Sequence, residues 1–155
     1  MSFLSIFKKK EKEFFSDQEK ELIVTAIKSA ELRTSGEVRV YVEGKCEYVD
    51  AIDRALEIFA GLKMYETADR NAVLVYIALK DHQLAIFGDE GIHQKVGTQF
   101  WNAEVVKMLQ HFNKQNFAQG IAEVVKDVGE VLVHHFPYDK STDKNELPDD
   151  IVFGA

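Results

Sequence analysis

The first regular pattern of apolar and polar positions along the chain predicts an amphipathic helix. Residues 16–19 (SDQE) form a capping box, in which Ser16 accepts from the Glu19 backbone N–H and the Glu19 side chain reaches back. One apolar face then recurs at helical spacing: Leu22, Ile23, Ala26, Ile27 and Ala30. The pattern stops at residues 34–36 (TSG), so we expect the helix between these two signals.

Three later segments have the patterns of β-strands. Residues 37–43 (EVRVYVE) alternate polar and apolar, as a half-buried strand does. Residues 71–79 (NAVLVYIAL) are apolar almost throughout, which is typical of a central strand covered on both faces. Between these two strands, residues 49–64 return to helical spacing. Strand, helix and strand together predict a parallel βαβ unit. After a turn at residues 80–82, residues 83–87 (QLAIF) predict a third strand running back antiparallel.

The second half of the chain is predicted to be helical. After a loop over residues 88–97, two apolar stripes at helical spacing indicate two long helices, the second ending before Pro137. The fold class is therefore α/β. We expect a three-layer α/β/α sandwich, in which a small mixed sheet (the βαβ unit plus an antiparallel hairpin strand) is flanked by about four helices, two on each side. One domain is expected over residues 16–136, with an N-terminal extension over 1–15 and a C-terminal tail over 137–155 that packs on or near it.

The net charge of the chain limits the classes of partner that it is expected to bind. Nineteen Lys plus Arg stand against 26 Asp plus Glu, a net charge of −7, which disfavours nucleic acid and anionic membranes as partners. The single Cys46 excludes an internal disulfide and fits a reducing compartment, so we expect a soluble cytoplasmic protein. The N-terminus places apolar residues before Lys8, the reverse of a secretory signal. The N-terminal segment could bind a membrane surface or a groove on a partner. The alternative is that it packs on its own domain.

Several polar residues stand where the predicted strands begin or end. If the first two strands are parallel and the third is antiparallel, Glu37, Asn71 and Asp89 meet at one edge of the sheet. Glu90 follows Asp89, and the pair is bracketed by glycines. Carboxylate and amide oxygens on such a loop are ligands for Ca²⁺ or Mg²⁺, and the lack of convergent Cys and His disfavours zinc or copper. The alternative is that these side chains are solvated strand-end residues.

Two arginines lie near these residues in the sequence. The sequence gives little support for covalent catalysis. Arg70 and Arg39 are candidates for binding an anion or a partner. His93 is the one histidine that we consider for a site, since it is close to Asp89 in sequence. The chain has no Gly-x-Ser-x-Gly motif and no phosphate-binding Gly-rich loop, and Cys46 has no evident His partner, so covalent catalysis is not expected.

The order of elements and three local strings resemble the TPM-domain family. The strings are residues 34–40 (TSGEVRV), 70–75 (RNAVLV) and 87–92 (FGDEGI), within a match over roughly residues 16–136. The chain is most similar to short stand-alone bacterial members. The resemblance implies an α/β/α sandwich with a divalent-cation site at the strand-end edge. It also raises acid phosphatase activity, which has been reported for a thylakoid-lumen member involved in photosystem repair. The chain departs from the family pattern at Arg70, where an Asp is common, at Ala72, where Gly is common, and at Asp89 and Glu90, where Tyr is common.

Three functions remain open from the sequence. The first is a non-catalytic module that binds Ca²⁺ or Mg²⁺ and a protein partner. The second is a metal-assisted phosphomonoester hydrolase in which Arg70 or Arg39 clamps phosphate oxygens. The third is a protein-interaction or assembly factor with a vestigial site.

Overall fold

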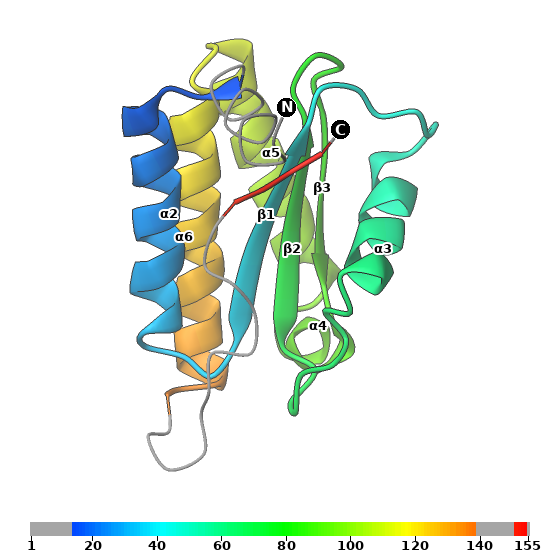
Figure 1. The fold of residues 1–155 in the computed structure, drawn as a ribbon. Helices are drawn as coiled ribbons and strands as arrows, with labels where there is room; N and C mark the ends of the chain where they lie inside the picture. The colour runs from blue at the N-terminus through cyan, green and yellow to red at the C-terminus, as the bar shows by residue number, and fades with distance from the viewer. Residues whose placement is uncertain (1–13, 139–150, 155) are drawn as a thin grey trace, which may run out of the picture.

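A four-stranded mixed sheet separates two helical layers in the computed structural model, which describes residues 14–138 and 151–154 (Figure 1). The strands are β1 (Glu37–Glu43), β2 (Ala72–Ala78), β3 (Gln83–Gly88) and β4 (Val152–Phe153), in the spatial order β3-β2-β1-β4. β2 is parallel to β1 and antiparallel to β3, as predicted. β4 is an addition to the predicted sheet and pairs parallel with β1.

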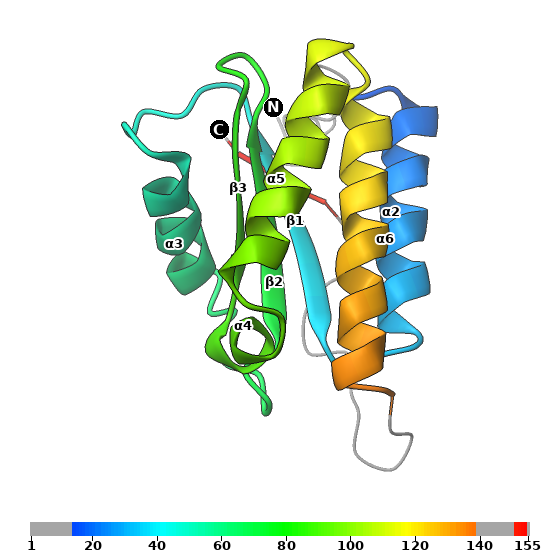
Figure 2. The same cartoon turned by 180° about the vertical axis from the view of Figure 1, so that it is seen from behind.

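The helices are distributed unequally over the two faces of the sheet. The helices α2 (Asp17–Glu31), α5 (Thr98–Asn113) and α6 (Phe117–His135) cover one face, and α3 (Ala51–Gly61) covers the other (Figure 2). The α/β/α prediction is confirmed, but the expectation of two helices on each side is wrong. The reason is that α2 packs chiefly against α6, where Gly129 leaves no room for a Cβ, which would lie 2.6 Å from the Cβ of Ala30.

The prediction of a loop over residues 88–97 is also wrong, because a short helix, α4 (Glu90–Val96), occupies most of this segment. Asp89 is the N-cap of α4, and its side chain accepts from the Glu90 backbone N–H. Within α4 only Ile92 is buried. A helix this short, with one core contact, has no apolar period that the sequence could reveal.

Two apolar clusters occupy the spaces on either side of the sheet. Alternate residues such as Val38 and Val75 pack beneath α2, α5 and α6. The intervening residues of the strands, among them Leu74 and Tyr76, belong to the cluster on the opposite face, with Phe59 of α3. Every residue of β2 is buried, which explains the unbroken apolar run that predicted a central strand.

The described ends of the chain lie beside each other. Phe14 and Phe153 stack with ring centroids 6.1 Å apart, and Phe15 is buried. Most of the N-terminal extension and of the C-terminal tail expected from the sequence lies outside the described residues. Within the described part of the chain, no helix combines the length and apolarity that crossing a membrane requires.

Candidate functional site at the strand-start edge

The strand pairing brings three chain segments to one edge of the sheet. Register pairs Glu37 with Ala72 across the parallel strands, and Val73 with Gly88 across the antiparallel ones. Two hydrogen bonds extend these ladders to the edge. Glu37 N donates to Asn71 O at 3.3 Å, and Asp89 N donates to Ala72 O at 2.9 Å. The backbone convergence that the topology predicted is therefore confirmed.

The predicted side chains at this edge are buried. Glu37 is 2% exposed, Asn71 1% and Asp89 3%, whereas polar groups at strand ends are usually solvated. A solvated role for these three residues is therefore excluded. Since burying a polar group costs free energy unless it is paired, the partners of each one decide what the edge can do.

Asn71 is held by the segments on either side of it. Its backbone N–H donates to Thr67 Oγ1 at 3.2 Å, and its Nδ2 donates to Ser35 Oγ at 3.3 Å. Its Oδ1 is buried and accepts no hydrogen bond from any of the residues described in the structure. An amide oxygen in this state is a potential ligand for a hard cation or a water.

Asp89 is paired with Arg70. Arg70 Nε lies 2.7 Å from Asp89 Oδ2 and Nη2 lies 2.8 Å from Oδ1, a bidentate ion pair. Its hydrogen bond to Asp89 raises the pKa of Arg70. Arg70 has a φ of 51°, in the left-handed region that favours Gly, Asn and Asp. The backbone strain and the ion pair together place a cation beside Asp89.

The remaining candidates lie at the margin of this edge. The Glu90 side chain is 63% exposed and lies 3.4 Å from Arg70 Nη1. Arg39 lies further into β1, opposite Leu74, and is half-buried. Burial lowers the pKa of Arg39, and the Glu31 carboxylate opposes that effect. His93 does not join the edge, because its Nδ1 accepts from Trp101 Nε1 at 3.0 Å.

The edge does not present a ready-made metal centre. Across residues 14–138 and 151–154, no three His, Cys, Asp or Glu side chains are grouped so that they could hold a metal ion. A cation here would need the Asn71 amide oxygen, backbone carbonyls or water in addition to carboxylates. It would also compete with the Arg70 guanidinium for Asp89.

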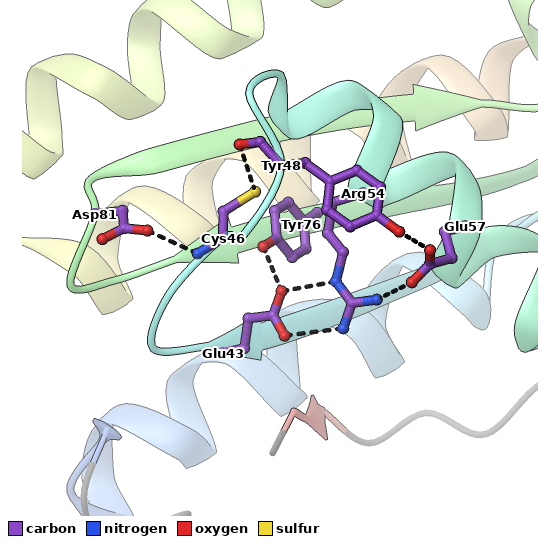
Figure 3. Close-up of polar contacts among 7 residues, drawn as sticks. All are labelled: Glu43, Cys46, Tyr48, Arg54, Glu57, Tyr76 and Asp81. Carbon is purple, nitrogen blue, oxygen red and sulfur yellow. Dashed lines mark hydrogen bonds and ion pairs between the residues drawn. The ribbon is translucent and has the colours of Figure 1, made fainter.

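A second polar cluster, which the sequence did not predict, lies at the opposite end of β1 (Figure 3). Glu43, the last residue of β1, accepts from Arg54 Nε at 2.9 Å and from Nη2 at 3.0 Å. The Tyr76 hydroxyl also donates to Glu43, and Arg54 pairs further with Glu57. Beside this cluster is a cavity of about 620 Å³, whose lining includes Tyr41.

The groups of the second cluster satisfy one another. Bonding to Glu43 raises the pKa of Arg54, and burial, followed by the Glu43 hydrogen bond, raises that of Tyr76. No side-chain polar atom of Glu43, Arg54 or Tyr76 is buried without a partner. The cluster therefore explains how a buried carboxylate is tolerated and does not call for a ligand. Its one sequence signal was a strand that ends on an acidic residue.

Comparison with known proteins agrees with this fold. The sequence profile of the TPM domain matches residues 9–131. The chain belongs to the TPM-domain family. Among solved structures, it is similar to the BA42 protein from the psychrophilic bacterium Bizionia argentinensis, with 39% identity and a TM-score of 0.82. That match covers 91% of this chain and 96% of BA42.

A more distant neighbour shares the fold alone. The N-terminal domain of the cg2496 protein from Corynebacterium glutamicum matches with 14% identity and a TM-score of 0.62, covering 77% of this chain and 75% of that domain. The search of curated proteins found no match. The expected likeness to a short stand-alone bacterial TPM protein is confirmed by the match to BA42, which extends over nearly the full length of both chains.

Proposed function

We propose that this TPM domain is a non-catalytic binding module that holds a divalent cation, Ca²⁺ or Mg²⁺, at the strand-start edge. The observation that supports the proposal best is the buried Asn71 Oδ1, which accepts no hydrogen bond from the described residues. The backbone of Asn71 is hydrogen-bonded to that of Glu37, and Asp89, a second buried acid, is joined by its backbone to the next residue, Ala72. Hard oxygens of these types are the ligands of both ions.

The proposal predicts weak binding, because Arg70 already neutralises Asp89. A divalent ion would have to displace the guanidinium from two hydrogen bonds or bind beside its positive charge. Two like charges at typical surface separations repel by about 1 kcal/mol or more. The Arg70 side chain is 42% exposed, so it can swing into solvent when an ion binds.

A titration of the ¹⁵N-labelled protein with CaCl₂ and with MgCl₂ tests the proposal. We expect saturable amide shifts centred on residues 36–37, 70–72 and 88–91. Asp89→Asn should abolish most of the binding, because it removes a charge and a ligand oxygen while Asn still caps α4. Glu90→Gln is the matched control and should cost less, since the Glu90 side chain is mostly in solvent.

Arg70→Asp should tighten divalent binding. It replaces the competing cation by a carboxylate, and Asp tolerates the left-handed backbone at this position better than Arg does. Shifts centred elsewhere, or unchanged affinity in both the Asp89→Asn and the Arg70→Asp variants, would remove the site from this edge.

The hydrolase alternative is tested on the same sample. Arg70 is engaged with Asp89 and Glu90, and Arg39 lies within β1, so neither arginine is presented as a phosphate clamp. We therefore expect no release of phosphate from a generic phosphomonoester in the presence of Mg²⁺. Turnover that depends on Asp89 would establish the hydrolase instead.

A further inference from the structure

Helix α3 carries exposed apolar side chains next to the apolar stripe that faces the sheet. The inner stripe consists of Ala55, Ile58 and Phe59, all buried. Along one flank of that stripe, Ile52 and Leu56 are one turn apart and each is 41% exposed. Val49, just before the helix, is 96% exposed. The apolar surface of α3 therefore extends beyond the part that the sheet covers.

Exposed apolar residues are concentrated in α3 and the segment just before it. Ten large apolar side chains of the described chain are exposed, and four of them, Tyr48, Val49, Ile52 and Leu56, fall within nine consecutive residues. The other six are spread from α2 to Tyr138. α3 is the single helix drawn on its side of the sheet, and no described element lies over its outer side (Figures 1 and 2). Exposed apolar groups that cluster in this way mark interaction sites more often than scattered ones do.

An acidic edge runs beside these apolar residues. At 100° per residue, Ile52 and Leu56 form an arc of about 40°, and Asp53 follows about 60° beyond Leu56. Val49 and Asp50 come just before the helix. Asp50 is the N-cap of α3, yet its side chain makes no capping hydrogen bond. Neither aspartate forms an ion pair within the described part of the chain. Glu57, the next acid along this edge, is already bound by Arg54 and Tyr48.

We propose that the exposed flank of α3, formed by Ile52, Leu56 and Asp53 together with Val49 and Asp50 just before the helix, docks a basic amphipathic helix of a protein partner. An apolar stripe on the partner would cover the apolar arc, and Lys or Arg beside that stripe would meet the two unpaired carboxylates. A second copy of this chain does not fit, because two acidic edges would repel. An anionic membrane surface is disfavoured for the same reason. The proposal does not depend on the cation site.

The proposal is tested with a synthetic peptide of about 18 residues, or five helical turns, with Leu along one face and Lys elsewhere. A scrambled peptide of the same composition has the same charge but no apolar face, and so measures attraction by charge alone. Each is titrated into the ¹⁵N-labelled protein in EDTA, which keeps the result separate from cation binding. We expect saturable amide shifts centred on residues 48–61, with the scrambled peptide binding at least about tenfold more weakly.

Matched variants locate the docking surface. Ile52→Gln and Leu56→Gln should each weaken peptide binding about fivefold or more, and Asp53→Lys should weaken it and reduce its salt dependence. Leu22→Gln, on α2 and similarly exposed at 42%, is the control and should bind as the wild type does. Equal binding of both peptides, shifts centred outside α3, no binding, or an unaffected Leu56→Gln variant would overturn the proposal. Binding to phosphatidylglycerol vesicles that Ile52→Gln abolishes would assign the face to a membrane instead.

Discussion

At the scale of single residues, the ion pairs of this TPM domain differ in how much they contribute to stability. Glu43 and Arg54 are largely buried, with side chains 7% and 22% exposed, and the carboxylate receives two hydrogen bonds from the guanidinium. Arg33 and Glu130 are paired at 3.1 Å, but their side chains are 51% and 53% exposed. The carboxylate of the first pair is largely shielded from water, and that of the second pair is not.

Arg54→Ala should therefore destabilise the fold far more than Arg33→Ala. Removing Arg54 leaves Glu43 buried without its compensating charge, which costs about 3 kcal/mol or more. Removing Arg33 from an exposed pair should cost less than about 1 kcal/mol. Urea unfolding of both variants checks the difference. Equal losses would mean that water or another cation reaches Glu43.

Glu104 is a buried carboxyl group whose charge opposes folding. It lies on α5, is 5% exposed, and has Lys107 Nζ at 3.8 Å and Asp127 nearby. Burial, followed by its hydrogen bond to Asp127, raises the pKa of Glu104 to about 7. Between its unfolded pKa and about pH 7 the folded state therefore holds a proton that the unfolded state has released, so stability falls as pH rises through this range.

Glu104→Gln should flatten the pH dependence of stability. The amide mimics the protonated acid and cannot ionise. Between pH 5 and pH 8 the wild type should lose on the order of 2 kcal/mol in free energy of unfolding, and the variant should not. The midpoint of urea unfolding across this range measures the effect, with Glu21→Gln, on the exposed surface of α2, as the control. Parallel pH profiles for wild type and Glu104→Gln would show that Glu104 is ionised throughout.

At the scale of elements, the short helix α4 positions the strand-start edge. Gly91, in its first turn, donates its backbone N–H to Arg70 O at 2.8 Å. A Cβ at Gly91 would lie 2.0 Å from Asp69 O and 2.7 Å from Arg70 O, so glycine is needed for the helix to approach this backbone. The contact holds Asp89 where Arg70 can reach it.

Gly91→Ala should separate α4 from residues 69–70. The clash is with backbone atoms that cannot rotate away, so we expect a loss of about 1 to 3 kcal/mol despite the better helix propensity of Ala. Amide shifts at Arg70 and Asp89 should change as well. Gly61→Ala at the end of α3 is the control, since nothing lies within 4 Å of the added Cβ and stability should be unchanged or higher. A stable Gly91→Ala variant with unshifted Arg70 would refute the close docking of α4.

At the scale of the whole molecule, the two apolar clusters carry the stability of the fold. One fills the space between the sheet and α2, α5 and α6, and the other fills the space between the sheet and α3. β2 contributes to both, with all seven residues buried. Neither cluster includes the candidate ligands Glu37, Asn71 and Asp89, so we expect the core to form without a bound ion.

The domain should therefore fold without metal. EDTA should leave the thermal unfolding midpoint unchanged, and excess Ca²⁺ should raise it only by the small amount that weak binding to the native state contributes. Thermal unfolding monitored by circular dichroism in both conditions measures this. Unfolding in EDTA at room temperature would show that an ion is part of the core.

Long, regular patterns in the sequence determined most of the fold. The capping box at Ser16 and Glu19 is formed as expected, and both cap hydrogen bonds are present. The alternation in residues 37–43 and the apolar run in β2 correctly predicted two strands, but β1 is covered on both faces and is not half-buried, since none of its residues is exposed. Strand directions then followed from connection lengths, and these directions predicted that Glu37, Asn71 and Asp89 lie at one edge of the sheet.

Only the tertiary structure decided which polar groups meet. Arg70 and Asp89 are 19 residues apart, and Tyr76 and Glu43 are 33 apart, so no local pattern relates them. The short elements α4 and β4 were missed for a similar reason, since seven and two residues are too few to show a period. Periodicity reports which face of an element is buried, because burial follows the backbone repeat. It does not report which side chain from a distant segment lies against that face, and that pairing determines the chemistry of the site.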